Sequence, residues 1–326
     1  MNPQVTCVGE TMLLLTATEA VPLDQAPSLS MGVAGAESNV ACGLAALGHG
    51  AAWLSAVGDD PFGRLLVRHL GEAGVDVSGT RVDPGRPTGL LAKDPSPTGS
   101  TVHYYRAGSA ASALGPDLAD HPHIRAAATV HLSGITPALS PTCDALTEHL
   151  LRSPETTVSF DVNHRPRLWR RGEAAPRLLE LARLADLVFV GRDEAEELWG
   201  THTARDVRDL LPDVDRLVVK DAEHGATEFG GEGETYVPAP RVEVVEPVGA
   251  GDAFAAGYLA ADLRGLDARG RLRLGHLCAG RVLRVTGDLA APPPPERLDA
   301  LLAVPDRRWT ERASAAVAAV RGDEHE

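Results

Sequence analysis

Lysine is scarce in this sequence: of its 31 basic side chains, two are lysines, Lys93 and Lys220, and the rest are arginines. Neither lysine follows the glycines of a G-x-x-x-x-G-K-[ST] string, so a Walker-A phosphate loop is excluded. A G-x-G-x-x-G string is also missing, which argues against a dinucleotide-dependent dehydrogenase. Any site for phosphates must therefore be built in another way.

Cysteine is scarce too, and its four copies are too far apart for any C-x-x-C pair, lying at Cys7, Cys42, Cys143 and Cys278. Scattered thiols argue against a zinc cluster or a disulfide framework and favour a reduced cytosolic protein. The N-terminus carries Glu10 and no basic stretch, which argues against a secretory signal. The longest stretch without acidic or basic side chains, 38–58, is interrupted by Asn39 and several glycines, so no membrane span is expected. We expect a cytoplasmic protein.

Basic charge is also outweighed, because 31 Lys and Arg face 45 Asp and Glu, for a net charge of -14. This surplus opposes non-specific attraction to nucleic acid or to anionic lipid, so neither partner is expected. Aromatic residues make up only 4% of the chain against 44% hydrophobic residues, which implies a packed aliphatic core. The 326 residues are enough for one large α/β unit or for two lobes.

Apolar strands and amphipathic helices alternate along the chain. Helices are predicted over 38–47, over 62–73 before Gly74, and over 309–320. The predicted strands are Val5–Val8, Ala51–Ala56, Thr129–Leu132, Val158–Phe160, Leu187–Val190 and Leu217–Val219. This βαβ order predicts an α/β fold with a mostly parallel sheet covered by helices on both faces.

Two segments break this alternation. The stretch 12–31 has no helical period and is rich in Thr, Pro and Ser. The stretches 88–92 and 101–105 have the composition of paired strands and are joined by the turn-rich residues 94–99. Together they predict a small β subdomain inserted in the α/β core, with plain loops as the alternative.

The most informative string is 246–252, Glu-Pro-Val-Gly-Ala-Gly-Asp, which precedes the charge-free run 253–261. Gly249, Ala250 and Gly251 allow a tight turn whose N–H groups point to one spot at the start of a buried helix, forming an anion hole. Asp252 would lie in the first helical turn, where it can accept a proton from a hydroxyl group. The alternative is that Asp252 only caps the helix.

A second string, 35–41, contains Gly35 and Asn39 and is followed by Gly48 and Gly58. A glycine turn that feeds a helix lets a small ligand approach the backbone, and the Asn39 amide offers sugar hydroxyls both a donor and an acceptor. Taken alone, this string favours the simpler interpretation of Asn39 as a helix-terminus residue.

In their order and spacing, the two strings resemble the two signature regions of the ribokinase-like (pfkB) carbohydrate kinase family. The resemblance implies a three-layer sandwich with a mostly parallel central sheet and a small β-sheet lid. It places a kinase domain at 1–305, with its core at 1–11, 34–86 and 107–305 and its lid at 12–33 and 87–106. A C-terminal helix and tail would follow at 306–326.

Two further stretches, 104–112 and 161–169, resemble the subgroup of this family that phosphorylates 2-keto-3-deoxygluconate. Asp161, Asn163 and Arg165 stand at every second position after a buried strand, so in an extended segment they would face the same way at the carboxyl end of the sheet. Arg106 follows two tyrosines and could clamp a carboxylate or a sugar. Surface salt bridging is the alternative for Arg106.

Residue roles follow from the resemblance. Asp252 is expected to be the general base, and Gly249, Ala250 and Gly251 the anion hole. The expected substrate contacts are Gly35, Asn39, Tyr104, Arg106, Arg165 and Asp288. The expected nucleotide contacts are Asn163, Arg165, Lys220, Gly225, Gly249 and Gly251, with a solvent-facing lysine as the alternative for Lys220. ATP and Mg²⁺ are the implied cofactors, and a monovalent cation is left open.

The sequence departs from the family pattern at two places. The family usually has Asp where Glu246 stands, and one more methylene could shift the anion-hole loop. The N-x-x-E motif, tied to magnesium, is present here as Gly-Arg-Asp-Glu at 191–194, so Glu194 matches while Gly191 replaces the Asn. A metal role for Glu194, through water, is therefore in doubt.

The predicted activity is transfer of the γ-phosphoryl group of ATP to the terminal hydroxyl of 2-keto-3-deoxygluconate. Two convergent guanidiniums, Arg106 and Arg165, favour an acidic sugar over a neutral one. The alternatives are a kinase for a neutral sugar such as fructose or ribose, and a catalytically silent sugar-binding regulator. Open edges of the lid strands predict a homo-oligomer formed through the lid.

Overall fold

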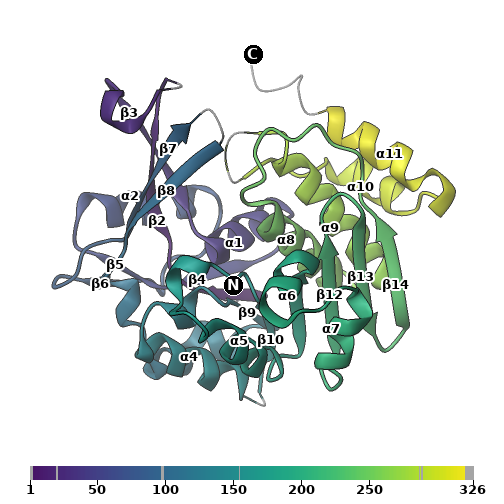
Figure 1. Ribbon diagram of the computed structural model, residues 1–326, viewed down its shortest axis with the longest axis horizontal. Coiled ribbons are helices and arrows are strands. Elements are labelled where there is room, and N and C mark those ends of the chain that lie inside the picture. Colours follow the sequence, from purple (N-terminus) through teal and green to yellow (C-terminus); the bar gives the residue numbers. More distant parts are fainter. Residues whose placement is uncertain are drawn as a thin grey trace.

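The computed structural model describes residues 3–19, 21–96, 99–153, 155–285, 287 and 289–319. The expected α/β architecture is confirmed, with a central eight-stranded sheet between two layers of helices (Figure 1). The strands run in the order β14(Gly233–Pro238), β13(Gly225–Gly230), β12(Arg216–Asp221), β11(Leu187–Gly191), β10(Thr157–Asp161), β9(Thr129–Ser133), β1(Val5–Val8) and β4(Ala51–Leu54). From β12 to β4 all neighbours are parallel, and β13 and β14 extend the sheet as antiparallel strands.

The strands are buried on both faces, which explains their nearly continuous apolar sequences. In β11, Leu187 and Phe189 contact one helical layer, whereas Val188 and Val190 contact the other. The first layer consists of α1(Ala36–Ala46), α2(Pro61–Glu72), α8(Ala250–Leu263), α9(Ala268–Val282), α10(Pro295–Leu302) and α11(Asp306–Ala318). The second consists of α3(Pro122–Ala126), α4(Pro141–Leu151), α5(Ala174–Ala182), α6(Arg192–Trp199) and α7(Ala204–Leu210). Because the strands from β12 to β4 are parallel, their carboxyl ends lie at the same edge of the sheet.

Local chemistry sets the ends of the predicted helices. Helix α2 begins where the Asp60 carboxylate accepts the Gly63 N–H at 2.8 Å, and it ends just before Gly74, whose φ is +85°. The last predicted helix, 309–320, is present but begins earlier, at Asp306, because Pro305 sets its start. Residue 320 lies outside the described residues.

A second, four-stranded sheet projects from one side of the core (Figure 1). Its order is β3(Leu29–Ala34), β2(Met12–Ala17), β7(Leu90–Ser96) and β8(Gly99–Tyr105), so strands rather than loops form from the segments that break the βαβ alternation. The predicted pairing of the last two strands is confirmed, with Leu90 opposite Tyr105. The first of them begins later than predicted, because Thr88 is tied to the Asp60 carboxylate through its N–H at 2.8 Å and its hydroxyl at 2.9 Å.

Helix α11, in the first layer, makes hydrogen bonds to the segment that follows β14. The Trp309 indole donates to the Pro238 carbonyl oxygen at 2.8 Å, and the Ser314 hydroxyl accepts the Arg241 N–H at 2.8 Å. Residues 239–249 then run without regular structure into α8. Among the described residues, no helix has both the length and the apolar character needed to cross a membrane.

Candidate active site

The start of α8 has the geometry that the glycine string predicts. Gly249 is the N-cap with φ +80°, a left-handed conformation that side chains disfavour. Within the described residues, no side chain caps this helix. The Ala250 N–H donates to the Pro247 carbonyl oxygen at 3.4 Å, so in this part of the structure the N–H groups of Gly251 and Asp252 are the ones left for a ligand. Asp252 lies in the first turn and does not act as the cap.

The Asp252 carboxylate is partly buried and is held by Asn39 of α1, whose Nδ2 donates to Oδ2 at 2.9 Å. The Asn39 side chain thus joins the two glycine strings and does more than end a helix. Burial raises the pKa of Asp252 to about 7; the Asn39 hydrogen bond opposes the rise and Asp161 adds to it. A carboxylate with a pKa near neutrality is suited to accept a proton.

Lys220 is the next-to-last residue of β12, and its charge interacts with the Asp252 carboxylate. Its Nζ lies 2.8 Å from Asp161 Oδ2, and a Cβ placed on Gly251 would be 3.6 Å from the same ammonium. Burial alone would lower the pKa of Lys220, but Asp161, Glu194 and Asp252 raise it, so the side chain stays charged. The solvent-facing alternative is wrong, because the Lys220 side chain is only 19% exposed.

Glu194 lies in the first turn of α6, where it is partly buried and accepts two backbone hydrogen bonds. It accepts the backbone N–H of Gly191 at 3.0 Å and the N–H of His164. Burial, with a contribution from Asp161, raises the pKa of Glu194. The described residues contain no group of three or more His, Cys, Asp or Glu side chains that could hold a metal. An all-protein magnesium cage is therefore not built here.

The segment after β10 is not extended, contrary to the expected alternation. Asn163 has φ +38°, which turns the chain after Val162, so the positions of Asp161, Asn163 and Arg165 do not follow a strand period. Asn163 is buried, whereas Arg165 is exposed and donates to the His164 carbonyl oxygen at 3.4 Å. The Arg165 charge lowers the pKa of Asp252, so the guanidinium lies in range of that carboxylate.

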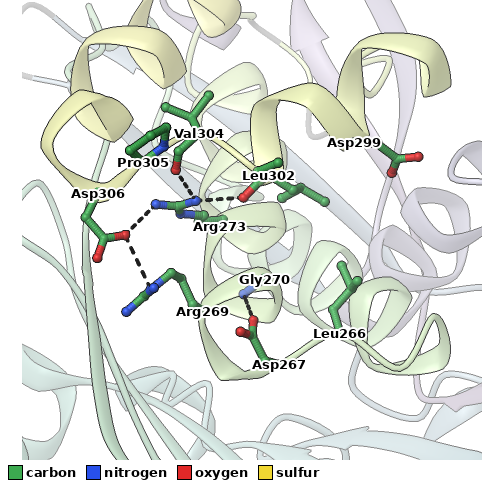
Figure 2. Close-up of a pocket in the computed structure, with 11 residues that line it drawn as sticks. Leu266, Asp267, Arg269, Gly270, Arg273, Asp299, Leu302, Val304, Pro305 and Asp306 are labelled. Carbon is green, nitrogen blue, oxygen red and sulfur yellow. Dashed lines mark hydrogen bonds and ion pairs between the residues drawn. The ribbon is translucent and has the colours of Figure 1, made fainter.

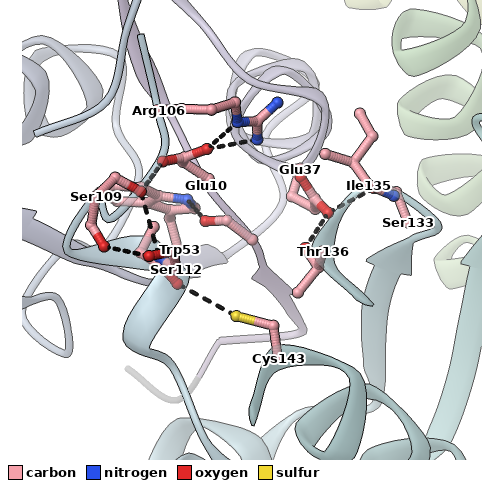
Figure 3. Close-up of polar contacts among 12 residues, drawn as sticks. Glu10, Glu37, Trp53, Arg106, Ser109, Ser112, Ser133, Ile135, Thr136 and Cys143 are labelled. Carbon is pink, nitrogen blue, oxygen red and sulfur yellow. Dashed lines mark hydrogen bonds and ion pairs between the residues drawn. The ribbon is translucent and has the colours of Figure 1, made fainter. Parts of the chain in front are cut away.

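Arg106 makes a buried ion pair, and the surface alternative is wrong. Its Nε donates to Glu10 Oε2 at 2.5 Å, and the Ser109 hydroxyl donates to the other oxygen of Glu10 (Figure 3). The Tyr104 ring lies 5.8 Å from the Arg106 guanidinium carbon. Because Glu10 offsets its charge, Arg106 does not by itself require an acidic ligand, which weakens the argument from two free guanidiniums.

A second buried acid, Glu37, lies within the glycine string 35–41, in the first turn of α1. It accepts hydrogen bonds from Ser133 at 2.7 Å and Thr136 at 3.0 Å (Figure 3). Gly35, the N-cap of α1, has no room for a side chain, since a Cβ there would lie 2.7 Å from the Glu10 carbonyl oxygen. Neither Glu10 nor Glu37 was predicted as a site residue, although the position of Glu10 just after a buried strand is a usable signal.

Two other predicted site residues, Gly225 and Asp288, add little to the description of the site. Gly225 begins β13 opposite Asp221, the residue after Lys220. Asp288 lies outside the described residues. The structure therefore gathers Asn39, Asp252, Gly251, Lys220 and Arg165 into one neighbourhood, and it says nothing of Asp288.

A cavity of about 530 Å³ lies elsewhere, between the start of α9, the end of α10 and the start of α11 (Figure 2). Arg269 and Arg273 line it, and both pair with Asp306, at 3.4 and 2.7 Å. Its charges thus compensate one another, and it contains none of the predicted site residues. Most of the predicted site residues that the structure describes lie elsewhere, at the starts of α1 and α8 and at the carboxyl end of the sheet.

Comparison with known proteins gives the family. Residues 2–294 match the family described as pfkB family carbohydrate kinase. The chain is 37% identical over 303 residues to the 2-dehydro-3-deoxygluconokinase of Bacillus subtilis, covering 90% of this chain and 94% of that one. It is 36% identical over 304 residues to the enzyme of the same name from Thermoproteus tenax, covering 90% and 93%. The structure of the PfkB protein from Polaromonas sp. JS666 covers 91% of this chain and 99% of its own, with a TM-score of 0.82 at 34% identity. Motifs, fold and relatives agree, and the chain belongs to the pfkB family of carbohydrate kinases.

Proposed function

We propose that the protein transfers the γ-phosphoryl group of ATP to the terminal hydroxyl of 2-keto-3-deoxygluconate, the sugar acid also called 2-dehydro-3-deoxygluconate. The observation that carries the proposal is the partly buried Asp252 carboxylate, held by Asn39 and with a pKa of about 7, beside the uncapped start of α8. Both relatives named above carry this substrate in their names. The small sheet would act as the lid over the site.

In this proposal Asp252 accepts the proton of the attacking hydroxyl. The N–H groups following Gly249 hold the negative charge that develops on the transferred group, as positioning and electrostatics dominate phosphoryl transfer. Lys220 adds a fixed positive charge next to Gly251. Asn39 keeps the Asp252 carboxylate oriented.

The charge balance of the site supports a divalent cation as cofactor. The three carboxyl groups of Asp161, Glu194 and Asp252 face two cationic side chains, Lys220 and Arg165, so the site has no surplus of positive charge to offset a triphosphate that arrives alone. Mg²⁺ is commonly held by one or two carboxylates together with substrate phosphates and waters. Asp161, whose Oδ1 is buried without a hydrogen-bond partner in the described structure, and Glu194 are the residues that would hold it, and the ion would neutralise phosphate charge. A monovalent cation remains a prediction.

The acceptor carboxylate is assigned to Arg165, with Tyr104 and the Arg106–Glu10 pair forming a polar wall. Arg165 is exposed and makes no ion pair in the part of the chain that the structure describes. Its guanidinium can therefore take a carboxylate or a phosphate oxygen without breaking an ion pair, and its described contact is the long hydrogen bond to the His164 carbonyl oxygen.

The test is a comparison of kcat/KM for 2-keto-3-deoxygluconate, fructose and ribose with MgATP. We expect the sugar acid to have the highest value, because only it offers Arg165 a carboxylate. A higher value for fructose or ribose would replace the proposed acceptor with a neutral sugar. If none of the sugars stimulates ADP formation, a silent sugar-binding regulator is the better interpretation.

We further propose that the small sheet forms a homo-oligomer interface. Strand β3 is an edge of that sheet, and its Leu29 and Met31 side chains are 43% and 61% exposed. Light scattering should give the mass of a dimer or a larger assembly, and Met31→Glu should shift it toward the monomer. A monomeric wild-type protein at micromolar concentration would contradict this interface.

A further inference from the structure

One ion pair joins the small sheet directly to the loop 239–249, which leads into α8. Lys93 of β7 pairs through Nζ with Oε2 of Glu246, which lies three residues before Gly249. The two side chains are only 20% and 19% exposed. Partial burial of this kind strengthens an ion pair relative to one on the open surface.

The second oxygen of Glu246 points into its own loop. Oε1 accepts the N–H of Val248 at 3.4 Å, so one carboxylate contacts both the small sheet and the turn that leads into Gly249. A movement of β7 that displaces Lys93 would therefore release the carboxylate that braces this turn.

A second contact, from the segment after β10, reaches the residue of the small sheet that pairs with Lys93. The Arg167 Nη1 donates to the Val102 carbonyl oxygen of β8 at 3.0 Å. Val102 is the cross-strand partner of Lys93. The loop before α8 and the segment after β10 thus hold one pair of facing residues, which fixes where β7 and β8 lie over the site.

We infer that the Lys93–Glu246 ion pair is a latch that sets the anion-hole loop in its working position only when the small sheet is closed over the site. Lys93 and Glu246 are thus positioning residues that act through the backbone at 247–251. The inference rests on the proposed kinase function, but its first test does not use activity.

The scarcity of lysine makes the latch measurable by amine chemistry. Lys93, Lys220 and the N-terminal amine are the chain's amines. During brief reductive methylation followed by peptide mass spectrometry, we expect Lys93 of the folded wild type to react at least about threefold more slowly than Lys93 of the urea-unfolded protein, as the loss of a modest ion pair implies. Glu246→Gln should speed Lys93 labelling by a similar factor, while Lys220, paired with Asp161, stays slow and serves as the internal reference. Equal labelling of Lys93 in the wild type and in Glu246→Gln would overturn the latch.

Kinetics of a charge exchange supply the second test. Lys93→Met and Glu246→Gln should each lower kcat/KM by about three- to tenfold, mainly through kcat, with only a small fall in the unfolding midpoint. The exchanged variant Lys93→Glu/Glu246→Lys should recover most of this loss, as only the pairing is restored. Arg205→Met, which removes a remote exposed pair with Glu234, is the matched control.

The two tests separate failure of the latch from failure of the proposed function. An inactive wild type with slow, Glu246-dependent Lys93 labelling would keep the latch and reject the kinase. An active wild type whose Lys93→Met variant keeps full kcat/KM would reject the latch and keep the kinase.

Discussion

Asp252→Asn is expected to lower kcat by about 10²- to 10⁴-fold while leaving KM for ATP and for the sugar acid near their wild-type values. Asparagine keeps an oxygen that can accept the Asn39 N–H, so the local geometry survives and only proton acceptance is lost. Steady-state kinetics would measure the effect. Asp117→Asn, at an exposed side chain that pairs with Arg81, is the control and should keep wild-type kcat.

The same variant should unfold less readily at high pH. The pKa of Asp252 is about 7 in the folded protein and near 3.9 in an unfolded chain, so the folded state binds more protons between these values. Stability contributed by this group is therefore lost as pH rises toward 7, and above pH 7 the ionised carboxylate remains a cost. Asp252→Asn removes that cost and should raise the free energy of unfolding at pH 8 by on the order of 1–4 kcal/mol.

The base also predicts a pH profile. The kcat/KM of the wild type should rise with pH through an apparent pKa near 7 and then level off, because the ionised form of Asp252 is the active one. If Asp252→Asn keeps more than a tenth of the wild-type kcat, or is less stable than the wild type at pH 8, Asp252 is not the base with the raised pKa described above.

Glu10→Gln is expected to lower the free energy of unfolding by about 3–5 kcal/mol, because it leaves the buried Arg106 guanidinium without its counter-charge. The Ser109 hydroxyl also loses a charged acceptor. Urea unfolding followed by circular dichroism would measure the change.

Two controls separate this burial effect from simple charge loss. The double variant Glu10→Gln/Arg106→Met should recover part of the stability, since it removes the unpaired charge. Asp120→Asn breaks an ion pair with Arg125 whose side chains are 80% and 63% exposed, and it should cost less than about 1 kcal/mol. Equal losses for Glu10→Gln and Asp120→Asn would contradict a buried pair at Glu10.

Much of the fold follows from the sequence, because strands buried on both faces must be continuously apolar. The apolar runs 158–160 and 217–219 are thus recognisable as parallel strands, and the structure extends each of them into the polar residues that follow, to Asp161 and Asp221. The Gly249 turn was predictable for a similar reason, since few residues other than glycine tolerate its φ of +80°.

What the sequence could not reveal depends on contacts between distant segments. Glu10 and Arg106 are 96 residues apart, and nothing in either local string shows that they neutralise each other. Lys93 and Glu246 are 153 residues apart, so Glu246 could be noticed only as a departure from a pattern. The left-handed Asn163 escaped the strand period because a single dihedral angle, unmarked by glycine, redirects the chain.

Helix α11 anchors the beginning of the loop 239–249, and this has a consequence for synthesis of the protein on the ribosome. Trp309 follows Pro238 by 71 residues, and Ser314 follows Arg241 by 73, so the loop is made well before the helix that fixes its beginning. The parallel strands and the start of α8 can assemble while the downstream chain is still in the exit tunnel. A nascent chain should therefore acquire its sheet first and its fully ordered loop 239–249 only after α11 has emerged, which makes enzymatic competence a late event in its maturation.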